Sequence, residues 1–117
     1  MKTTIAHIEM GEKKIPLVFN LNVLEEIQEN YGSLEKWAEI TQGDGVPNIK
    51  NLKAGLMAMF NEGIDIENEE NGTNEPFLTE KQVGRVISNV GLEGMLKKIR
   101  EITIASTKSG EEEGKNE

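Results

Sequence analysis

Residues 6–31 read AHIEMGEKKIPLVFNLNVLEEIQENY, and within this stretch the spacing of the apolar residues changes. Up to Phe19 the apolar residues alternate with others, which predicts two β-strands. From Asn20 onward they recur every three or four residues, which predicts an amphipathic helix. A hairpin that leads directly into helices indicates an α+β domain.

The predicted hairpin has one apolar side, as expected of strands with one face in a core. This side is formed by Ala6, Ile8, Met10, Ile15, Leu17 and Phe19. The two runs are separated by Gly11-Glu12-Lys13-Lys14, which predicts a four-residue loop. Pro16 cannot donate a hydrogen bond to a neighbouring strand, so we expect it at a free edge or at the start of its strand.

Beyond the hairpin the sequence predicts four or five short amphipathic helices, which makes the domain mostly helical. Residues that cap helix N-termini mark the predicted starts: Asn20 or Asn22, Ser33, Asn48 and Thr79, the last in a capping box with Gln82. Glycines mark the predicted ends: Gly32, Gly63 and Gly91. The apolar residues expected to face inward are Leu24, Ile27, Tyr31, Leu34, Trp37, Ile40, Ile49, Leu52, Leu56, Met59, Phe60, Val83, Val86, Ile87, Val90, Leu92, Met95, Leu96, Ile99 and Ile102.

The chain has 117 residues, the size of one domain, and a formal net charge of -8. The charge is concentrated in two stretches that are poor in large apolar residues. Residues 62–75 carry six acids and no base, and residues 106–117 carry four acids and two lysines. We therefore predict a single globular domain over residues 1–105, a flexible acidic loop over residues 64–77 inside it, and a disordered acidic tail over residues 106–117.

The composition disfavours several classes of function. The absence of cysteine removes disulfides, thiolate metal sites and thiol nucleophiles. The acidic balance argues against binding to nucleic acid or to an anionic membrane, because both need basic residues. The longest apolar run, residues 55–60, is far shorter than the roughly 20 residues that cross a bilayer. With only one histidine in the chain, we predict no enzyme activity, no cofactor and no metal.

Two stretches have residue types found in chemical sites. Asp65–Gly72 places oxygen ligands before a glycine, as a calcium loop does, but Leu78 stands where such a loop needs its closing glutamate. A solvated run of charges is the better interpretation. His7 lies on the polar face of its strand, and no nucleophile-elbow sequence surrounds Ser33 or Ser88. His7 is therefore predicted to be an exposed or half-buried strand residue.

Three residues are candidates for contact with a partner protein: Trp37, Met57 and Met59. Trp37 is the only tryptophan, and it also fits a core position. Met57 and Met59 lie about 200° apart on a helix, so both cannot face the same core. Either Met57 faces outward, where a flexible apolar side chain can bind a partner helix, or the helix is buried on nearly all sides.

The chain also resembles a known family in the order of its turn, strand and cap residues. The matching residues are Gly11, Ile15-Pro16-Leu17, Phe19-Asn20-Leu21, Leu24-Glu25, Ile27, Tyr31-Gly32-Ser33-Leu34, Leu52, Gly55-Leu56, Leu78-Thr79-Glu80-Lys81-Gln82-Val83-Gly84 and Ile87. Over residues 3–105 the pattern resembles the small tail assembly chaperones of long-tailed bacteriophages and prophages of Gram-positive hosts. The long acidic insert before Leu78, where relatives commonly have a short link, is a departure from that pattern.

The resemblance implies a non-catalytic protein of virion assembly that is made in the host cytoplasm. Such chaperones bind the tape-measure protein, a long helical chain with exposed apolar surface, and keep it soluble until tail-tube subunits polymerise around it. The tail-tube protein is a second candidate partner, and the chaperone is expected to be absent from the mature virion. The family supplies no position-by-position site, so Trp37, Met57 and Met59 are predictions from the residues alone.

Two other functions fit the same composition. A structural tail or head-completion component would be retained in the virion in stoichiometric amount. An acidic regulator that imitates DNA would need carboxylates ordered at phosphate-like spacing, whereas the predicted loop and tail leave them disordered.

Overall fold

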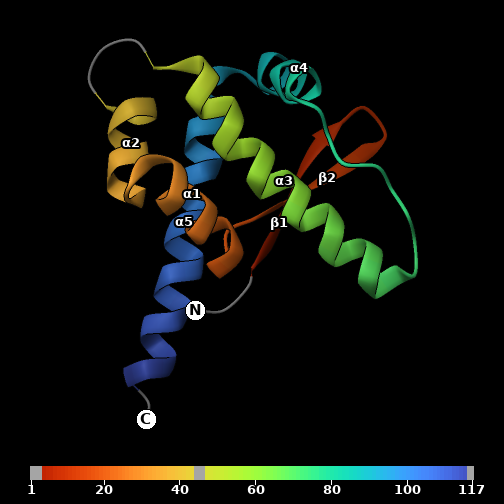
Figure 1. The fold of residues 1–117 in the computed structure, drawn as a ribbon. Helices are drawn as coiled ribbons and strands as arrows, with labels where there is room; N and C mark the ends of the chain where they lie inside the picture. Colours follow the sequence, from red (N-terminus) through yellow and green to blue (C-terminus); the bar gives the residue numbers. More distant parts are fainter. Residues whose placement is uncertain (1–3, 44–46, 116–117) are drawn as a thin grey trace.

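In a computed structural model, which describes residues 4–43 and 47–115, the chain forms an α+β domain that is mostly helical. The elements in chain order are β1 (Ile5–Met10), β2 (Lys13–Val18), α1 (Leu21–Tyr31), α2 (Leu34–Gln42), α3 (Ile49–Asn71), α4 (Glu80–Val90) and α5 (Leu92–Lys115). The two strands form one antiparallel sheet, and the helices follow it (Figure 1). The prediction of a hairpin followed by helices is confirmed.

The helices begin where the sequence predicts. Each predicted cap accepts a hydrogen bond from a backbone N–H of the first turn, and these caps are Asn20, Ser33, Asn48 and Thr79. The bond satisfies an N–H group that has no partner inside the helix. Asn20 rather than Asn22 caps α1, and Thr79 forms the predicted capping box.

The hairpin turn is shorter than predicted. Only Gly11 and Glu12 lie between the strands, because β2 already begins at Lys13. Gly11 has φ = 63°, a conformation that glycine adopts without steric cost. Two-residue turns match the twist of the flanking strands, and the predicted four-residue loop would remove two cross-strand pairs. Pro16 lies within β2 and is accommodated because a sheet of two strands leaves each strand a free edge.

The course of α3 differs from the sequence prediction. The sequence predicts a helix end at Gly63, but the helix continues and is capped by Gly72 in the left-handed conformation, with φ = 66°. Gly63 is required by packing, since a Cβ at this position would lie 2.9 Å from the Cβ of Pro16. Residues 64–71 were predicted as part of a flexible loop and are helical, and Ile64 at the start of this stretch is buried against the rest of the domain. Residues 72–79 form the remaining connection to α4.

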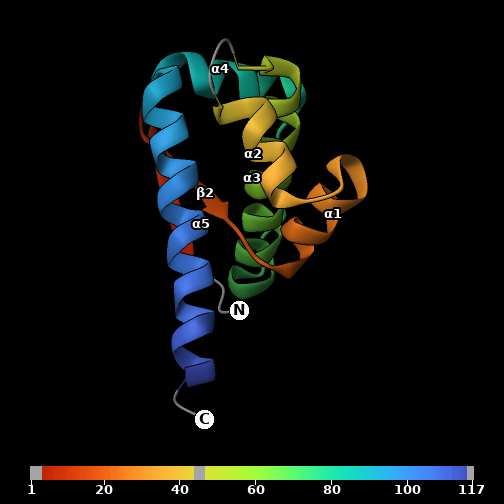
Figure 2. The same ribbon diagram turned by 90° about the vertical axis from the view of Figure 1, so that its left-hand side faces the viewer.

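α5 runs along one side of the molecule and extends beyond the other elements (Figure 2). Residues 106–115 belong to this helix, although the sequence predicts a disordered tail over residues 106–117. Each residue added to an existing helix forms one more backbone hydrogen bond. Residues 116 and 117 lie outside the described residues.

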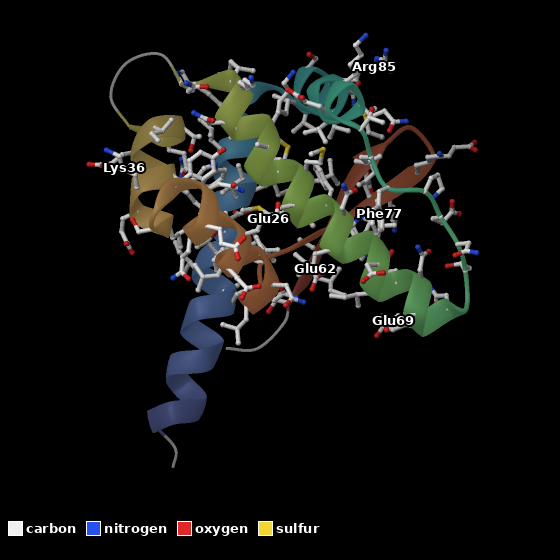
Figure 3. The ribbon with its side chains drawn as sticks, in the orientation of Figure 1. Glu26, Lys36, Glu62, Glu69, Phe77 and Arg85 are labelled. Atoms are coloured by element: carbon white, nitrogen blue, oxygen red, sulfur yellow. The ribbon has the colours of Figure 1, made fainter. Side chains whose placement is uncertain are left out.

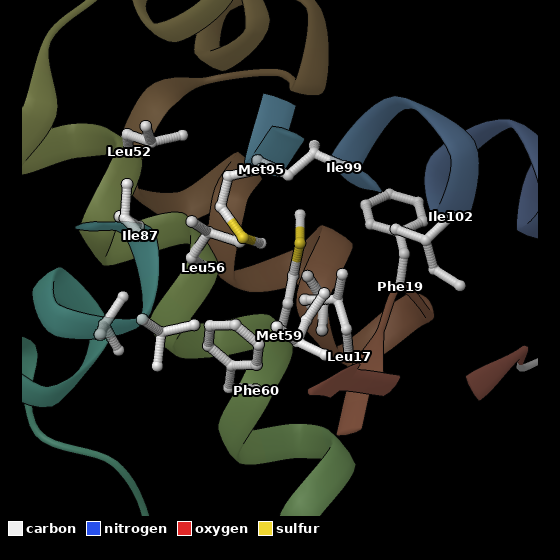
Figure 4. Close-up of a cluster of buried hydrophobic side chains, with 14 of the residues drawn as sticks. Leu17, Phe19, Leu52, Leu56, Met59, Phe60, Ile87, Met95, Ile99 and Ile102 are labelled. Carbon is white, nitrogen blue, oxygen red and sulfur yellow. The ribbon is translucent and has the colours of Figure 1, made fainter. Parts of the chain in front are cut away.

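A single hydrophobic cluster joins the hairpin to the helices (Figure 4). Leu17 and Phe19, from the second strand and the residue after it, meet Met59 of α3 and Ile102 of α5 in this cluster. Among the apolar residues predicted to face inward, Ile49 is the exception, with 45% of its surface exposed. The core thus fixes α3 between the hairpin and α1, which positions the surface described next.

Candidate functional site

The three predicted partner-binding residues lie in different environments. Trp37 is fully buried: its Nε1 donates a hydrogen bond to the carbonyl of Asn51 at 3.0 Å, and its ring fills the space that Gly55 leaves open. Met59 is fully buried in the core. Because both side chains are used for packing, the prediction that they contact a partner is corrected. Met57 is half-buried and lines an open groove.

This groove lies on the outward face of α3 and has a volume of about 370 Å³. α3 supplies its floor through Met57, Ala58 and Asn61. α1 supplies one side through Val23, and Phe77, from the connection to α4, supplies the other. Figure 1 shows α3 between α1 and this connection. Three segments that are far apart in the sequence therefore build one surface, which we call the α3 groove.

The α3 groove has an acidic rim. Glu26 of α1 and Glu62 and Asp65 of α3 line it, and its described lining includes no lysine, arginine or histidine. Figure 3 shows Glu26 and Glu62 on the same side of the molecule as Phe77. Glu26 and Asp65 are exposed, and neither forms an ion pair with a described residue. A groove with an apolar floor and a negatively charged rim is suited to bind a partner whose apolar surface is bordered by positive charges.

α1 is tied to α3 at both of its ends. At the N-terminal end, the side-chain amides of Asn20 and Asn22 donate hydrogen bonds to Oε2 of Glu62 at 2.7 and 2.8 Å. At the other end, the hydroxyl of Tyr31 donates to Oδ1 of Asn51 at 3.1 Å. Burial raises the pKa of Tyr31 above its ordinary value of 10.0, which keeps this donor protonated. The two helices therefore run antiparallel, and the α1 side of the groove has a defined position.

The connection between α3 and α4 is held against α3 by two asparagines. The Asn61 amide donates to the Leu78 carbonyl at 3.2 Å, and its Oδ1 accepts from the Leu78 N–H at 2.8 Å. Asn68 forms the same pair with Glu75, at 3.0 and 2.9 Å. Seven helical residues span about 10.5 Å and three extended residues span about 10 Å, so the two pairs fit one extended segment lying along α3.

Phe77 lies within this held segment, and 54% of its surface is exposed. An aromatic ring on a backbone that is fixed on both sides has few conformations to lose on binding. Phe77 was not among the predicted partner-binding residues because it falls in the stretch predicted to be flexible, residues 64–77. A local signal was present: Phe77 is the only aromatic residue after Phe60, and Pro76 before it restricts the backbone.

A second groove, of about 400 Å³, lies between β2, the C-terminal half of α3 and the connection. Phe77 lines it too, together with Lys13, Lys14 and Glu67. Glu67 is also bonded to Nε2 of His7 at 2.7 Å. Because charges of both signs line this groove, it gives no preference for the charge of a partner.

Within residues 4–43 and 47–115 no group of three or more His, Asp or Glu side chains is placed to hold a metal ion. Residues 65–71, compared above with a calcium loop, are helical, so their side chains point around the helix axis. His7 is an exposed strand residue, as predicted, and Ser33 is used as a helix cap.

No protein-family model, curated protein or solved structure matches the chain. Among the described helices, none is long and apolar enough to span a lipid bilayer. Function is therefore inferred from the residues and from the geometry of the α3 groove.

Proposed function

We propose that this protein is a non-catalytic phage tail assembly chaperone. It acts in the host cytoplasm, where it binds the tape-measure protein and keeps it soluble until the tail tube is built. The observation that carries the proposal is the α3 groove, which combines an apolar floor, an exposed aromatic ring held in place and an acidic rim. The resemblance of residues 3–105 to the tail assembly chaperones supports the same proposal.

The α3 groove suits a helical client. A long helical chain with uncovered apolar surface aggregates unless that surface is covered. Met57 and Phe77 can cover apolar side chains of such a chain. The net charge of -8 keeps the resulting complexes apart by mutual repulsion. A small groove gives a modest contact area, which is typical of transient complexes and allows the client to be released.

The proposal is tested by locating the protein during assembly. A tagged copy should co-purify with the tape-measure protein from lysates of induced cells and should be missing from purified particles. Quantitative mass spectrometry of both fractions measures this, with the tail-tube protein as the positive control for particles. Stoichiometric presence in particles, without association with free tape-measure protein, would instead identify a structural tail or head-completion component.

A second candidate, an acidic DNA mimic, is favoured by one observation. Glu62, Asp65 and Glu69 are spaced three and four residues apart on α3, so one helical face carries three carboxylates in order. The sequence predicts Asp65 and Glu69 to lie in a flexible loop, whereas the structure places them in α3. The apolar Met57 and Phe77 beside them have no counterpart on a DNA backbone, which favours the chaperone. A DNA mimic would displace duplex DNA from a host nuclease or repressor and would not co-purify with the tape-measure protein.

A further inference from the structure

We infer that the α3 groove is the docking site for an amphipathic helix of the tape-measure protein whose apolar residues are flanked by lysine or arginine. The inference rests on the proposed function for the identity of the partner. The recognition chemistry comes from the groove itself. This chemistry determines which segments of the very long tape-measure protein the chaperone binds.

The floor of the groove sets the length of the bound segment. Met57 and Asp65 are eight residues apart on α3, which is about 12 Å along the helix axis. A helix lying along this floor presents about two turns to it. Its apolar contacts then come from side chains at positions i, i+4 and i+7, the usual anchors of a helix bound in a groove.

Phe77 and Met57 supply the apolar contacts. The Phe77 ring is exposed. The backbone next to it is held in place, because the N–H and the carbonyl of Leu78 both form hydrogen bonds with the Asn61 side chain. Met57, on the floor, has a flexible thioether side chain that adapts to different apolar shapes. A groove lined by a fixed aromatic ring and an adaptable methionine can accept many helices of one chemical class.

The acidic rim supplies the selectivity. Glu62 accepts hydrogen bonds from Asn20 and Asn22, which hold its carboxylate in place without adding a positive charge. Glu26 and Asp65 are exposed and form no ion pair with a described residue. The described lining contains no base, so the complementary charge must come from the partner. Lysine or arginine beside an apolar stripe provides it.

Among the residues whose exposure the structure describes, the other large exposed apolar side chains do not form a comparable surface. Leu21, Ile49 and Ile104 are 63%, 45% and 62% exposed, and none of them lines either described groove. Apolar residues scattered singly over a surface are ordinary. Phe77 differs because it lines the α3 groove, as Met57 does.

A designed peptide tests the recognition chemistry without the tape-measure protein. The probe is a synthetic amphipathic helix of about 15 residues, near the shortest length at which an isolated helix forms in water. It carries a leucine stripe flanked by lysines, and a second peptide carries glutamate in place of every lysine. Binding to the full chain is measured by titration calorimetry at low and high salt. We expect the lysine peptide to bind, more weakly as salt screens the charges, and the glutamate peptide not to bind.

An apolar pair of variants locates the binding surface. Phe77→Ser removes the ring at the edge of the groove, and Ile104→Ser is the matched control because it removes an exposed apolar side chain from α5. We expect Phe77→Ser to weaken lysine-peptide binding by at least about tenfold and Ile104→Ser to change it by less than about twofold. Both side chains are more than half exposed, so both variants should fold.

A charge pair of variants tests the rim. Glu26→Lys combined with Asp65→Lys reverses two acids of the groove. Glu29→Lys combined with Glu70→Lys makes the same change of net charge on the same two helices, at exposed positions outside the groove. We expect the first pair to weaken lysine-peptide binding about tenfold and the second to weaken it by less than about threefold at physiological salt, where distant charges are screened.

The failure of this inference and the failure of the proposed function give different results. Groove variants that bind the lysine peptide as tightly as the wild type, or a glutamate peptide that binds equally well, would overturn the inference. Tape-measure protein that co-purifies equally with wild type and groove variants would also overturn it, while leaving the proposed function in place. Groove-dependent binding of the peptide without any binding of tape-measure protein would support the recognition chemistry and overturn both the partner assignment and the proposed function.

Discussion

Asn61 and Leu78 are joined by two hydrogen bonds, one in each direction, of 3.2 and 2.8 Å. A side chain of α3 thus bonds the backbone of the connection as a neighbouring strand would, satisfying both polar groups of one residue. Because Leu78 follows Phe77 in the chain, this contact determines where the exposed ring lies. The shape of the α3 groove depends on it.

Asn61→Ala should loosen the connection between α3 and α4. The variant loses two partly exposed hydrogen bonds, which should lower the free energy of unfolding by about 1–2 kcal/mol. The Leu78 amide should exchange its hydrogen faster, as measured by hydrogen–deuterium exchange. Asn74→Ala is the control, since Asn74 is an exposed residue of the same connection. Unchanged protection of Leu78 in Asn61→Ala would show that other contacts hold the connection.

Gly55→Ala should destabilise the core. The new Cβ would collide with the buried indole of Trp37, which also donates a hydrogen bond to Asn51 and cannot move freely. We expect a loss of about 1–3 kcal/mol in the free energy of unfolding, measured by urea denaturation.

Gly84→Ala is the matched control for this substitution. Gly84 lies inside α4, where a Cβ would make an ordinary contact of 3.4 Å with the flexible Lys53 side chain. Because alanine favours helices over glycine, this variant should be as stable as the wild type or more stable by up to about 1 kcal/mol. Equal effects of the two substitutions would rule out the close packing of Trp37 on α3.

Asn20→Ala should cost more stability than Asn22→Ala. Both side chains donate to Glu62, but Asn20 also caps α1 by accepting a hydrogen bond from the N–H of Val23 at 3.1 Å. Loss of a cap costs about 0.5–2 kcal/mol, and loss of an exposed contact costs less. Thermal unfolding followed by circular dichroism measures both. A larger effect of Asn22→Ala would contradict the assignment of the cap.

Tyr31 should make the free energy of unfolding depend on pH above about pH 10. Burial raises the pKa of Tyr31 above 10.0, so the neutral phenol is favoured in the folded state. The stability that this group contributes is therefore complete below pH 10 and is lost as the pH rises through the folded pKa.

Tyr31→Phe isolates this effect. At pH 7 the variant should be less stable by about 0.5–1.5 kcal/mol, because it loses the hydrogen bond to Asn51. Above pH 10 the gap in unfolding free energy between the two proteins should narrow, since only the wild type has a phenol to ionise. Denaturation curves at several pH values measure the gap, and a gap that widens above pH 10 would contradict the burial of this hydroxyl.

The features that the sequence predicted well are local ones. The caps Asn20, Ser33, Asn48 and Thr79 each bond a backbone N–H three residues ahead, so the residue type and its neighbours decide the structure. The helix ends at Gly32 and Gly91 were predicted for the same reason, because both glycines have positive φ. The apolar spacing likewise identified most of the buried residues, although it missed Val18, Val23 and Ile64.

The features that were missed depend on contacts between distant residues. Gly63 has the same signature in the sequence as Gly32, but it is a glycine because Pro16 approaches it from β2. The exposure of Phe77 depends on Asn61 and on Asn68, which hold the connection from the neighbouring helix. Acidic composition suggested flexibility over this stretch, whereas paired hydrogen bonds give it a defined path. The α3 groove could therefore be identified only after the elements were placed in space.

The measurement that tests the proposed function most directly is the solubility of the tape-measure protein of the proposed source phage, expressed with and without this chain. We expect tape-measure protein alone to be largely insoluble. Co-expression with the wild-type chain should recover the tape-measure protein in the soluble fraction, where the two proteins should co-elute on size-exclusion chromatography. Co-expression with the Phe77→Ser variant should recover less tape-measure protein in the soluble fraction. Tape-measure protein that stays insoluble beside a folded, abundant wild-type chain would contradict the proposed chaperone function.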